Sequence, residues 1–243
     1  MSIATIEQTK DSRTPPKVDR GAQVIGNIKR LIEESNINRN DFYKVFRSRR
    51  FTPAQLKWVF QQYYYYIRTF PQILAGTSHH VDNELVRMKL ARTVVSELGD
   101  GIGKAHFLMF EDVLRAVGVT LDDWKGVNYI PEASDLVRGL RTLFLEKPAT
   151  YSIGAHYVIE EFGLPMIVAL YEGFRQYDGW RHEDFGYFYL HMLVEGDHVA
   201  WITAAVKDMA DSDTHVSEIE DGAREVLVLL NNFWSGLARI AAN

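Results

Sequence analysis

The chain has 243 residues, a net charge of −5 and no cysteine, which excludes disulfides, thiolate metal ligands and a cysteine nucleophile. An acidic balance gives no general footprint for nucleic acid, and 47% hydrophobic with 24% charged residues is typical of a globular protein. No apolar run approaches the roughly 20 residues of a membrane-spanning helix, and the N-terminus lacks a signal-peptide core. These features predict a cytoplasmic protein that binds neither nucleic acid nor membrane.

Helical hydrophobic spacing begins after residues 1–20, a polar segment whose composition is typical of a flexible leader. In the first half of the chain this spacing predicts helices over about 21–36, 41–50, 53–76, 82–96 and 105–117. Thr52 followed by Pro53 is a typical N-cap and first helical residue. Pro71 is expected to kink the helix that they begin.

The second half of the chain continues the helical pattern. Residues 120–123 are expected to form a capped turn, and helices follow over about 131–146, 148–177, 184–209 and 213–242. No strand-like alternation, glycine-rich phosphate loop or internal repeat is found in the sequence. Seven to nine helices with short connections predict an all-α bundle, with residues 21–243 as one helical domain.

The run from His191 to His198 (HMLVEGDH) places three polar side chains inside an otherwise apolar helix. Since each helical residue advances about 100°, His191, Glu195 and His198 fall within roughly 60° of one another. Two buried imidazoles and a carboxylate need partners, and a metal ion satisfies all three. The alternative is an amphipathic helix on which these groups face water.

A metal held by one helix needs ligands from neighbouring helices. In the helix over 148–177, Glu160 shares a face with His156, four residues earlier, whereas Glu161 points about 100° away. We expect Glu160 to face the core. A pair of surface glutamates would fit the same pattern.

Glu97 and His106 flank three alternate glycines, Gly99, Gly101 and Gly103. On an unbroken helix this separation would place the two side chains on roughly opposite sides. Glycine costs about 1 kcal/mol inside a helix and permits unusual dihedral angles, so a break here can turn both groups to one centre. Without a metal, the same segment is an ordinary loop between helices.

Together these segments offer three carboxylates and three imidazoles as candidate metal ligands and catalytic residues: Glu97, His106, Glu160, His191, Glu195 and His198. Two iron or manganese ions need about that many protein ligands while keeping positions open for dioxygen. A zinc site with three protein ligands would leave half of the set unexplained.

The order of these residues, over about 38–210, resembles the heme-oxygenase-like diiron oxidase and oxygenase family, which is related in fold to the TenA- and PqqC-like proteins. That family carries a Glu, a nearby His, a Glu on a later helix, and then His-x3-Asp/Glu-x2-His. In this chain these are Glu97, His106 and Glu160, followed by the motif from His191 to His198. Glu195 stands where many relatives have Asp.

The resemblance implies a heme-oxygenase-like bundle and two Fe ions, which in the Fe(II) state capture O2 as co-substrate and need an external reductant. Relatives oxygenate amine nitrogens, desaturate or fragment amino acids, or decarboxylate fatty acids to terminal alkenes. The resemblance also implies two ligand sets. We expect these to be Glu97, His106 and His198 for one ion, and His191, Glu195 and a bridging Glu160 for the other.

Several aromatic residues could line a substrate pocket, although aromatic side chains at helical spacing more often fill the core: Tyr63, Tyr64, Tyr65, Tyr66, Phe70, Tyr157, Tyr187 and Tyr189. His156 is a candidate partner of a metal ligand or a substrate contact. A substrate carboxylate would need a basic residue such as Arg68, Arg87 or Arg92. We predict oxidation of a small amine or amino acid in a biosynthetic pathway, with a fatty-acid oxidative decarboxylase as the alternative.

Other classes of protein predict a different set of residues. A thiaminase-type hydrolase of the same fold would need a catalytic cysteine, and a cofactor-free PqqC-like oxidase would not need six metal-type residues. A ferritin-like carboxylate protein needs Glu-x-x-His twice, and this chain has it once, at Glu195. If the six candidate ligands face solvent, the sequence would instead fit a non-enzymatic helical binding protein. The expected partners are a small-molecule substrate and an unidentified electron donor, with a homodimer left open.

Overall fold

The computed structural model describes residues 19–101 and 103–242, so the expected leader lies almost entirely outside the described residues. The described chain is helical and contains no strand, which confirms the all-α prediction. Its α-helices are α1 (Arg20–Ser35), α2 (Asp41–Ser48), α3 (Pro53–Thr77), α4 (Glu84–Glu97), α5 (His106–Ala116), α6 (Pro131–Arg141), α7 (Ala149–Phe174), α8 (Gly186–Met209) and α9 (Asp213–Ala242). Four short 3-10 or π-helical segments are η1 (Ile37–Arg39), η2 (Trp124–Gly126), η3 (Thr142–Glu146) and η4 (His182–Phe185).

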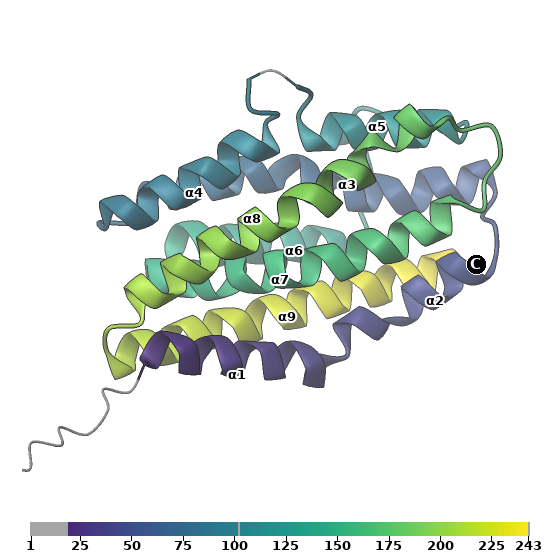
Figure 1. The fold of residues 1–243 in the computed structure, drawn as a ribbon. Coiled ribbons are helices and arrows are strands. Elements are labelled where there is room, and N and C mark those ends of the chain that lie inside the picture. The colour runs from purple at the N-terminus through teal and green to yellow at the C-terminus, as the bar shows by residue number, and fades with distance from the viewer. Residues whose placement is uncertain (1–18, 102, 243) are drawn as a thin grey trace, which may run out of the picture.

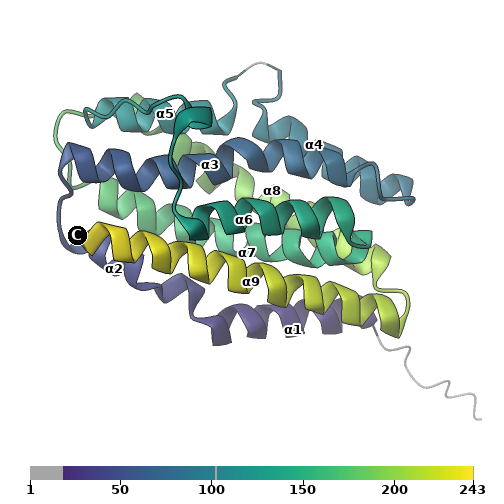
Figure 2. The same ribbon diagram turned by 180° about the vertical axis from the view of Figure 1, so that it is seen from behind.

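The helices run roughly lengthwise through the bundle, with α7 at its centre (Figure 1). In this view α1 and α2 lie along one side, and α3, α4 and α5 lie along the other. Figure 2 shows α6 and α9 covering the back of the molecule. Because α7 packs chiefly against α8 and α9, most of its residues are buried.

The apolar character of α7 reflects this central position. By length and composition α7 is long and apolar enough to cross a membrane, so the expectation that no apolar run approaches this length is wrong. However, 78% of its apolar window is buried inside the bundle, as expected for a core helix. Gly154 on α7 permits close packing, since a Cβ there would lie 1.8 Å from the carbonyl oxygen of Ile219 on α9.

Local sequence signals account for the helix ends that matter for the site. A capping box between Thr52 and Gln55 begins α3, and the helix continues through Pro71 to Thr77. The break after α4 occurs where the glycines predicted it, with φ of 90° at Gly99 and 73° at Gly101. These left-handed conformations are accessible to glycine, so the chain can turn there and begin α5 at His106.

Candidate metal centre

The six predicted ligands come together in the bundle interior from α4, α5, α7 and α8. Their donor atoms form two groups, within each of which all three atoms lie within 4.8 Å of one another. The first triad is Glu97, His106 and His191, and the second triad is Glu160, Glu195 and His198. All six side chains are buried except Glu97, whose side chain is 14% exposed.

This division differs from the expected one, because His191 and His198 exchange places. His191 lies nearer the start of α8, which packs against α5 and brings the imidazole to His106. His198 lies two turns further along α8, where its Nδ1 is 3.3 Å from Oε2 of Glu160 and 3.9 Å from Oε1 of Glu97. The helix packing, rather than the order in the sequence, therefore determines which histidine joins which triad.

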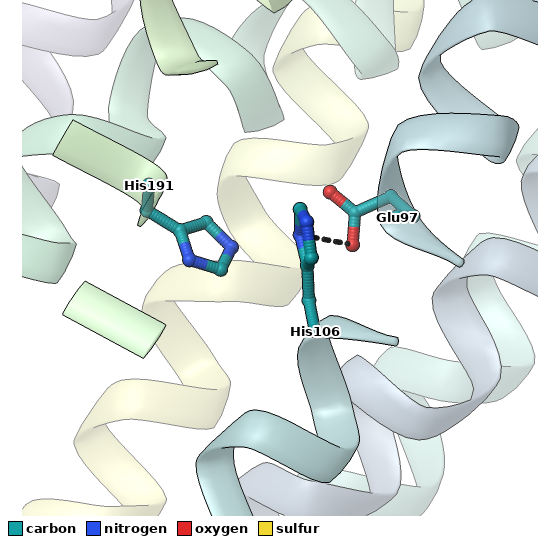
Figure 3. A group of neighbouring side chains, drawn as sticks. All are labelled: Glu97, His106 and His191. Carbon is teal, nitrogen blue, oxygen red and sulfur yellow. Dashed lines mark ion pairs between the residues drawn. The ribbon is translucent and has the colours of Figure 1, made fainter. Parts of the chain in front are cut away.

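The first triad joins both sides of the glycine break to α8. Figure 3 shows the His106 ring between the Glu97 carboxylate and the His191 ring. His106 Nδ1 lies 3.3 Å from Oε2 of Glu97, and the two imidazole centroids are 4.5 Å apart. Nδ1 of His191 donates to the carbonyl oxygen of Tyr187 over 2.7 Å. This hydrogen bond leaves Nε2 of His191 as the atom that can bind a metal.

His198 of the second triad contacts Ser96, a residue that was not predicted from the sequence. Nε2 of His198 lies 3.0 Å from Oγ of Ser96, a buried hydroxyl on α4 directly before Glu97. With Nε2 hydrogen-bonded to Ser96, Nδ1 of His198 is free to bind a metal beside Glu160. A serine within a helix carries no distinctive sequence signal, so only the contact between α4 and α8 identifies it.

The two adjacent glutamates of α7 face in different directions. Glu160 is buried and accepts a hydrogen bond from Nε2 of His156 over 2.7 Å, and His156 is also buried. Glu161 instead pairs with Lys29 on α1 at 2.9 Å and accepts from the hydroxyl of Tyr157 at 3.2 Å. Glu160 is therefore the glutamate that enters the centre, and His156 is placed to orient it.

The two carboxylates of the second triad have opposite protonation preferences. Burial, together with the negative charges of Glu160 and Glu97, raises the pKa of Glu195 to about 9. Burial acts in the same direction on Glu160, but the hydrogen bond from His156 and the adjacent His198 imidazole outweigh it and hold the pKa of that carboxyl well below its ordinary value. A bound cation would allow both carboxylates to be ionised, since it supplies the missing positive charge.

Two residues of the first triad, His191 and Glu97, have the protonation states that a metal needs. Burial, together with the charge of His106, lowers the pKa of His191 to about 4, so this imidazole is neutral at pH 7. Burial alone would raise the pKa of Glu97, but the adjacent His106 imidazole lowers it below its ordinary value. A neutral imidazole and an ionised carboxylate are the forms that coordinate metal ions.

Within the described part of the chain, buried atoms without a hydrogen-bond partner occur at three of the six residues. His106 Nδ1, Glu195 Oε2 and His198 Nδ1 are all buried without a hydrogen-bond partner among the described residues. Each such atom costs roughly 1–3 kcal/mol, and native proteins rarely retain them without a reason. Metal ions would satisfy all three atoms. Three carboxylates and three imidazoles are a suitable donor set for two iron ions.

A cavity of about 50 Å³ adjoins both triads. Four of the eight predicted aromatic residues line it: Tyr63, Tyr66, Phe70 and Tyr187. The other four, Tyr64, Tyr65, Tyr157 and Tyr189, do not. Aliphatic and aromatic side chains from α3, α5 and α7 complete the wall, so the cavity combines the polar groups of the triads with an apolar surface opposite them.

None of the arginines proposed for a substrate carboxylate lines this cavity. The Arg68 guanidinium lies 4.5 Å from the ring centroid of Phe107 and 5.5 Å from that of Trp124. Arg87 donates to Glu84 and to the carbonyl oxygen of Val81. Arg92 is exposed on the outer face of α4. The structure therefore places none of these three arginines where it could bind a substrate carboxylate in the cavity.

Comparison with known proteins also indicates an iron-containing redox enzyme. Residues 57–231 match the model of a family described as iron-containing redox enzymes. The chain is 25% identical over 202 residues to a 4-chloro-allylglycine synthase of Streptantibioticus cattleyicolor, covering 82% of this chain and 76% of that protein. It is 21% identical over 209 residues to a 4-aminobenzoate synthase of Chlamydia pneumoniae, covering 86% of this chain and 92% of that protein.

Solved structures share the fold. A CADD-like protein from Nostoc punctiforme superposes with a TM-score of 0.78 at 20% identity, covering 92% of this chain and 99% of that one. A TenA homologue from Pseudomonas syringae pv. tomato gives a TM-score of 0.72 at 14% identity, covering 93% and 98% of the two chains. With the family match over most of the sequence, these likenesses show that the chain belongs to the iron-containing redox enzymes with a heme-oxygenase-like fold and is an oxidoreductase.

Proposed function

We propose that this protein is a non-heme diiron oxidase or oxygenase that activates O2 to oxidise a small amine or amino acid in a biosynthetic pathway. The observation that carries the proposal is the convergence of two triads of donor atoms, three of them buried and unsatisfied, beside one cavity. The family match supports iron. The two relatives are named for 4-chloro-allylglycine and 4-aminobenzoate, and both names denote molecules with an amine and a carboxylate.

Each triad would hold one ion, and the bound pair would supply the electrons that reduce dioxygen, with an external donor restoring them. The chain itself provides the orientation. The Tyr187 carbonyl fixes the His191 ring, and Ser96 and His156 fix His198 and Glu160. Aromatic side chains form much of the cavity wall beside the reacting groups.

The cavity supports a small substrate over a fatty acid. Sites for drug-sized ligands enclose about 300–1,000 Å³, whereas this cavity encloses about 50 Å³. A long alkyl chain would have to displace much of the aromatic wall, while an amine or amino acid needs a smaller rearrangement.

Anaerobic loading with Fe(II) tests the proposal. We expect about two irons per folded chain. On adding O2 with a chemical reductant, small amines or amino acids should increase oxygen consumption, and fatty acids should not. A folded protein that takes up less than one iron per chain would contradict the diiron assignment. Oxygen consumption triggered by fatty acids alone would favour the oxidative decarboxylase instead.

A further inference from the structure

We propose that Gly163 is a positioning residue for the second triad, because the space that it leaves determines where the Glu195 carboxylate lies. This inference rests on the proposed function, since it takes Glu195 as a metal ligand. Gly163 lies on α7, about one turn after Glu160, and lines the cavity together with Glu160 and Glu195. Its backbone therefore forms the part of the site that faces the Glu195 side chain.

The contact between Gly163 and Glu195 leaves no room for a methyl group. A Cβ built on Gly163 would lie 2.9 Å from Oε2 of Glu195, and 3.2 Å from both Cδ and Oε1. All three nearest atoms belong to that one carboxylate. An alanine at position 163 would therefore press directly on the carboxylate and displace it.

Steric fit matters more for Glu195 than for its partners in the second triad. Glu160 is held by the hydrogen bond from His156, and His198 is held by Ser96. Oε2 of Glu195 is buried and has no hydrogen-bond partner among the described residues. The surrounding space, rather than a hydrogen bond, therefore fixes this oxygen.

A different pair of residues at positions 163 and 195 would fit the same space. Aspartate at position 195 would withdraw the carboxylate by about one carbon–carbon bond, roughly 1.5 Å. That withdrawal would make room for a methyl group at position 163. Gly163 with Glu195, and alanine with aspartate, are thus two solutions to the same packing problem. The end of a glutamate side chain is flexible, so Gly163→Ala should move the ligand while leaving the packing of α7 intact.

A double-mutant cycle tests this coupling. The wild type, Gly163→Ala, Glu195→Asp and the double variant are titrated with Fe(II) without oxygen, and the melting temperature of each metal-free protein is measured. We expect each single substitution to weaken binding at the second triad by about tenfold or more. The double variant should bind at least about tenfold more tightly than Gly163→Ala alone, because the shorter side chain relieves the clash.

A matched control lies next to Glu195 in the sequence. Gly196→Ala adds the same methyl group to α8, but its Cβ would meet nothing within 4 Å. Gly196 is also exposed, so this variant should bind iron as the wild type does. It separates the contact with the ligand from the general effect of replacing a helical glycine.

Several results would overturn the role of Gly163. One is unchanged iron binding in Gly163→Ala, and another is a double variant whose loss is the sum of the two single losses. If Gly163→Ala fails to fold, recovery of folding in the double variant supports the role, and no recovery contradicts it. If the wild type binds two irons and the losses of affinity in the variants are additive, the role of Gly163 is contradicted but the proposed function is not. A wild type that binds no iron would contradict the proposed function itself.

Discussion

The two triads are built in different ways, although they share one cavity. The first triad depends on the break between two helices, because Glu97 is the last residue of α4 and His106 is the first residue of α5. The second triad consists of residues within α7 and α8, far from the ends of either helix. The first has one carboxylate and two imidazoles, and the second has two carboxylates and one imidazole.

The supporting contacts differ as well. In the second triad Glu160 and His198 each have a buried polar partner from outside the triads, namely His156 and Ser96. In the first triad Glu97 and His106 are closest to each other, and their positions depend on the glycine-containing segment between them. Local backbone conformation therefore positions two residues of the first triad, Glu97 and His106, whereas packing between long helices positions the whole of the second triad. If this is correct, substitutions should affect the two triads separately.

The largest expected effect comes from Glu160→Gln. This nearly isosteric change removes the charge of a ligand but keeps the fold, so iron content should fall from about two per chain to one or less. The control is Glu161→Gln at the adjacent position. It removes an ion pair with Lys29, which we expect to contribute at most about 1 kcal/mol because Lys29 is largely exposed. Iron analysis and thermal melting would show the contrast, and equal iron loss in both variants would contradict it.

His191→Ala should remove one ion and spare the other. The substitution takes away one of the two imidazoles of the first triad, while Glu160, Glu195 and His198 remain. We expect about one iron per chain after anaerobic loading. His215→Ala is the matched control, since His215 is a half-exposed histidine paired with Asp211. Loss of both irons in His191→Ala would show that the two triads bind as a single unit.

Ser96→Ala should have a smaller effect, confined to the second triad. Removing a hydrogen-bond partner of a metal-bound histidine typically lowers metal affinity by about 10–100-fold. Ser152→Ala is a suitable control, because Ser152 is also buried but its hydroxyl donates to the carbonyl oxygen of Ala149 within α7. Fe(II) titration should show a weaker second ion in the first variant alone. Equal affinities in the two variants would exclude a role for Ser96.

Gly99→Ala should produce the smallest change, and in the first triad. A Cβ at Gly99 would lie 2.7 Å from the carbonyl oxygen of Lys104, and its φ of 90° is unfavourable for alanine. We expect affinity at the first triad to fall by a few-fold, that is by about 1 kcal/mol. Gly118→Ala is the control, because Gly118 also has a positive φ of 80° but no atom within 4 Å of its Cβ. Weaker binding at the second triad instead would contradict the separation of the two.

Much of the fold could be read from the sequence because its signals are local. The cap at Thr52, the glycine break after Glu97 and the helical spacing of apolar residues each depend on a few neighbouring positions. The same periodicity placed His191, Glu195 and His198 on one face of α8. It also favoured Glu160 over Glu161, and the structure places Glu160 inside. These features are fixed by the geometry of a single helix.

Helical periodicity could not predict which side chains on other helices these residues contact. The assignment of His191 and His198 to triads, the contact of Ser96 with His198, and the fit of Gly163 against Glu195 all join separate helices. Ser96 and His198 are 102 residues apart in the chain, and nothing local relates them. Helical periodicity specifies which side chains face inward, but not which side chain each one meets. That depends on how the helices pack, and only the tertiary structure decides it.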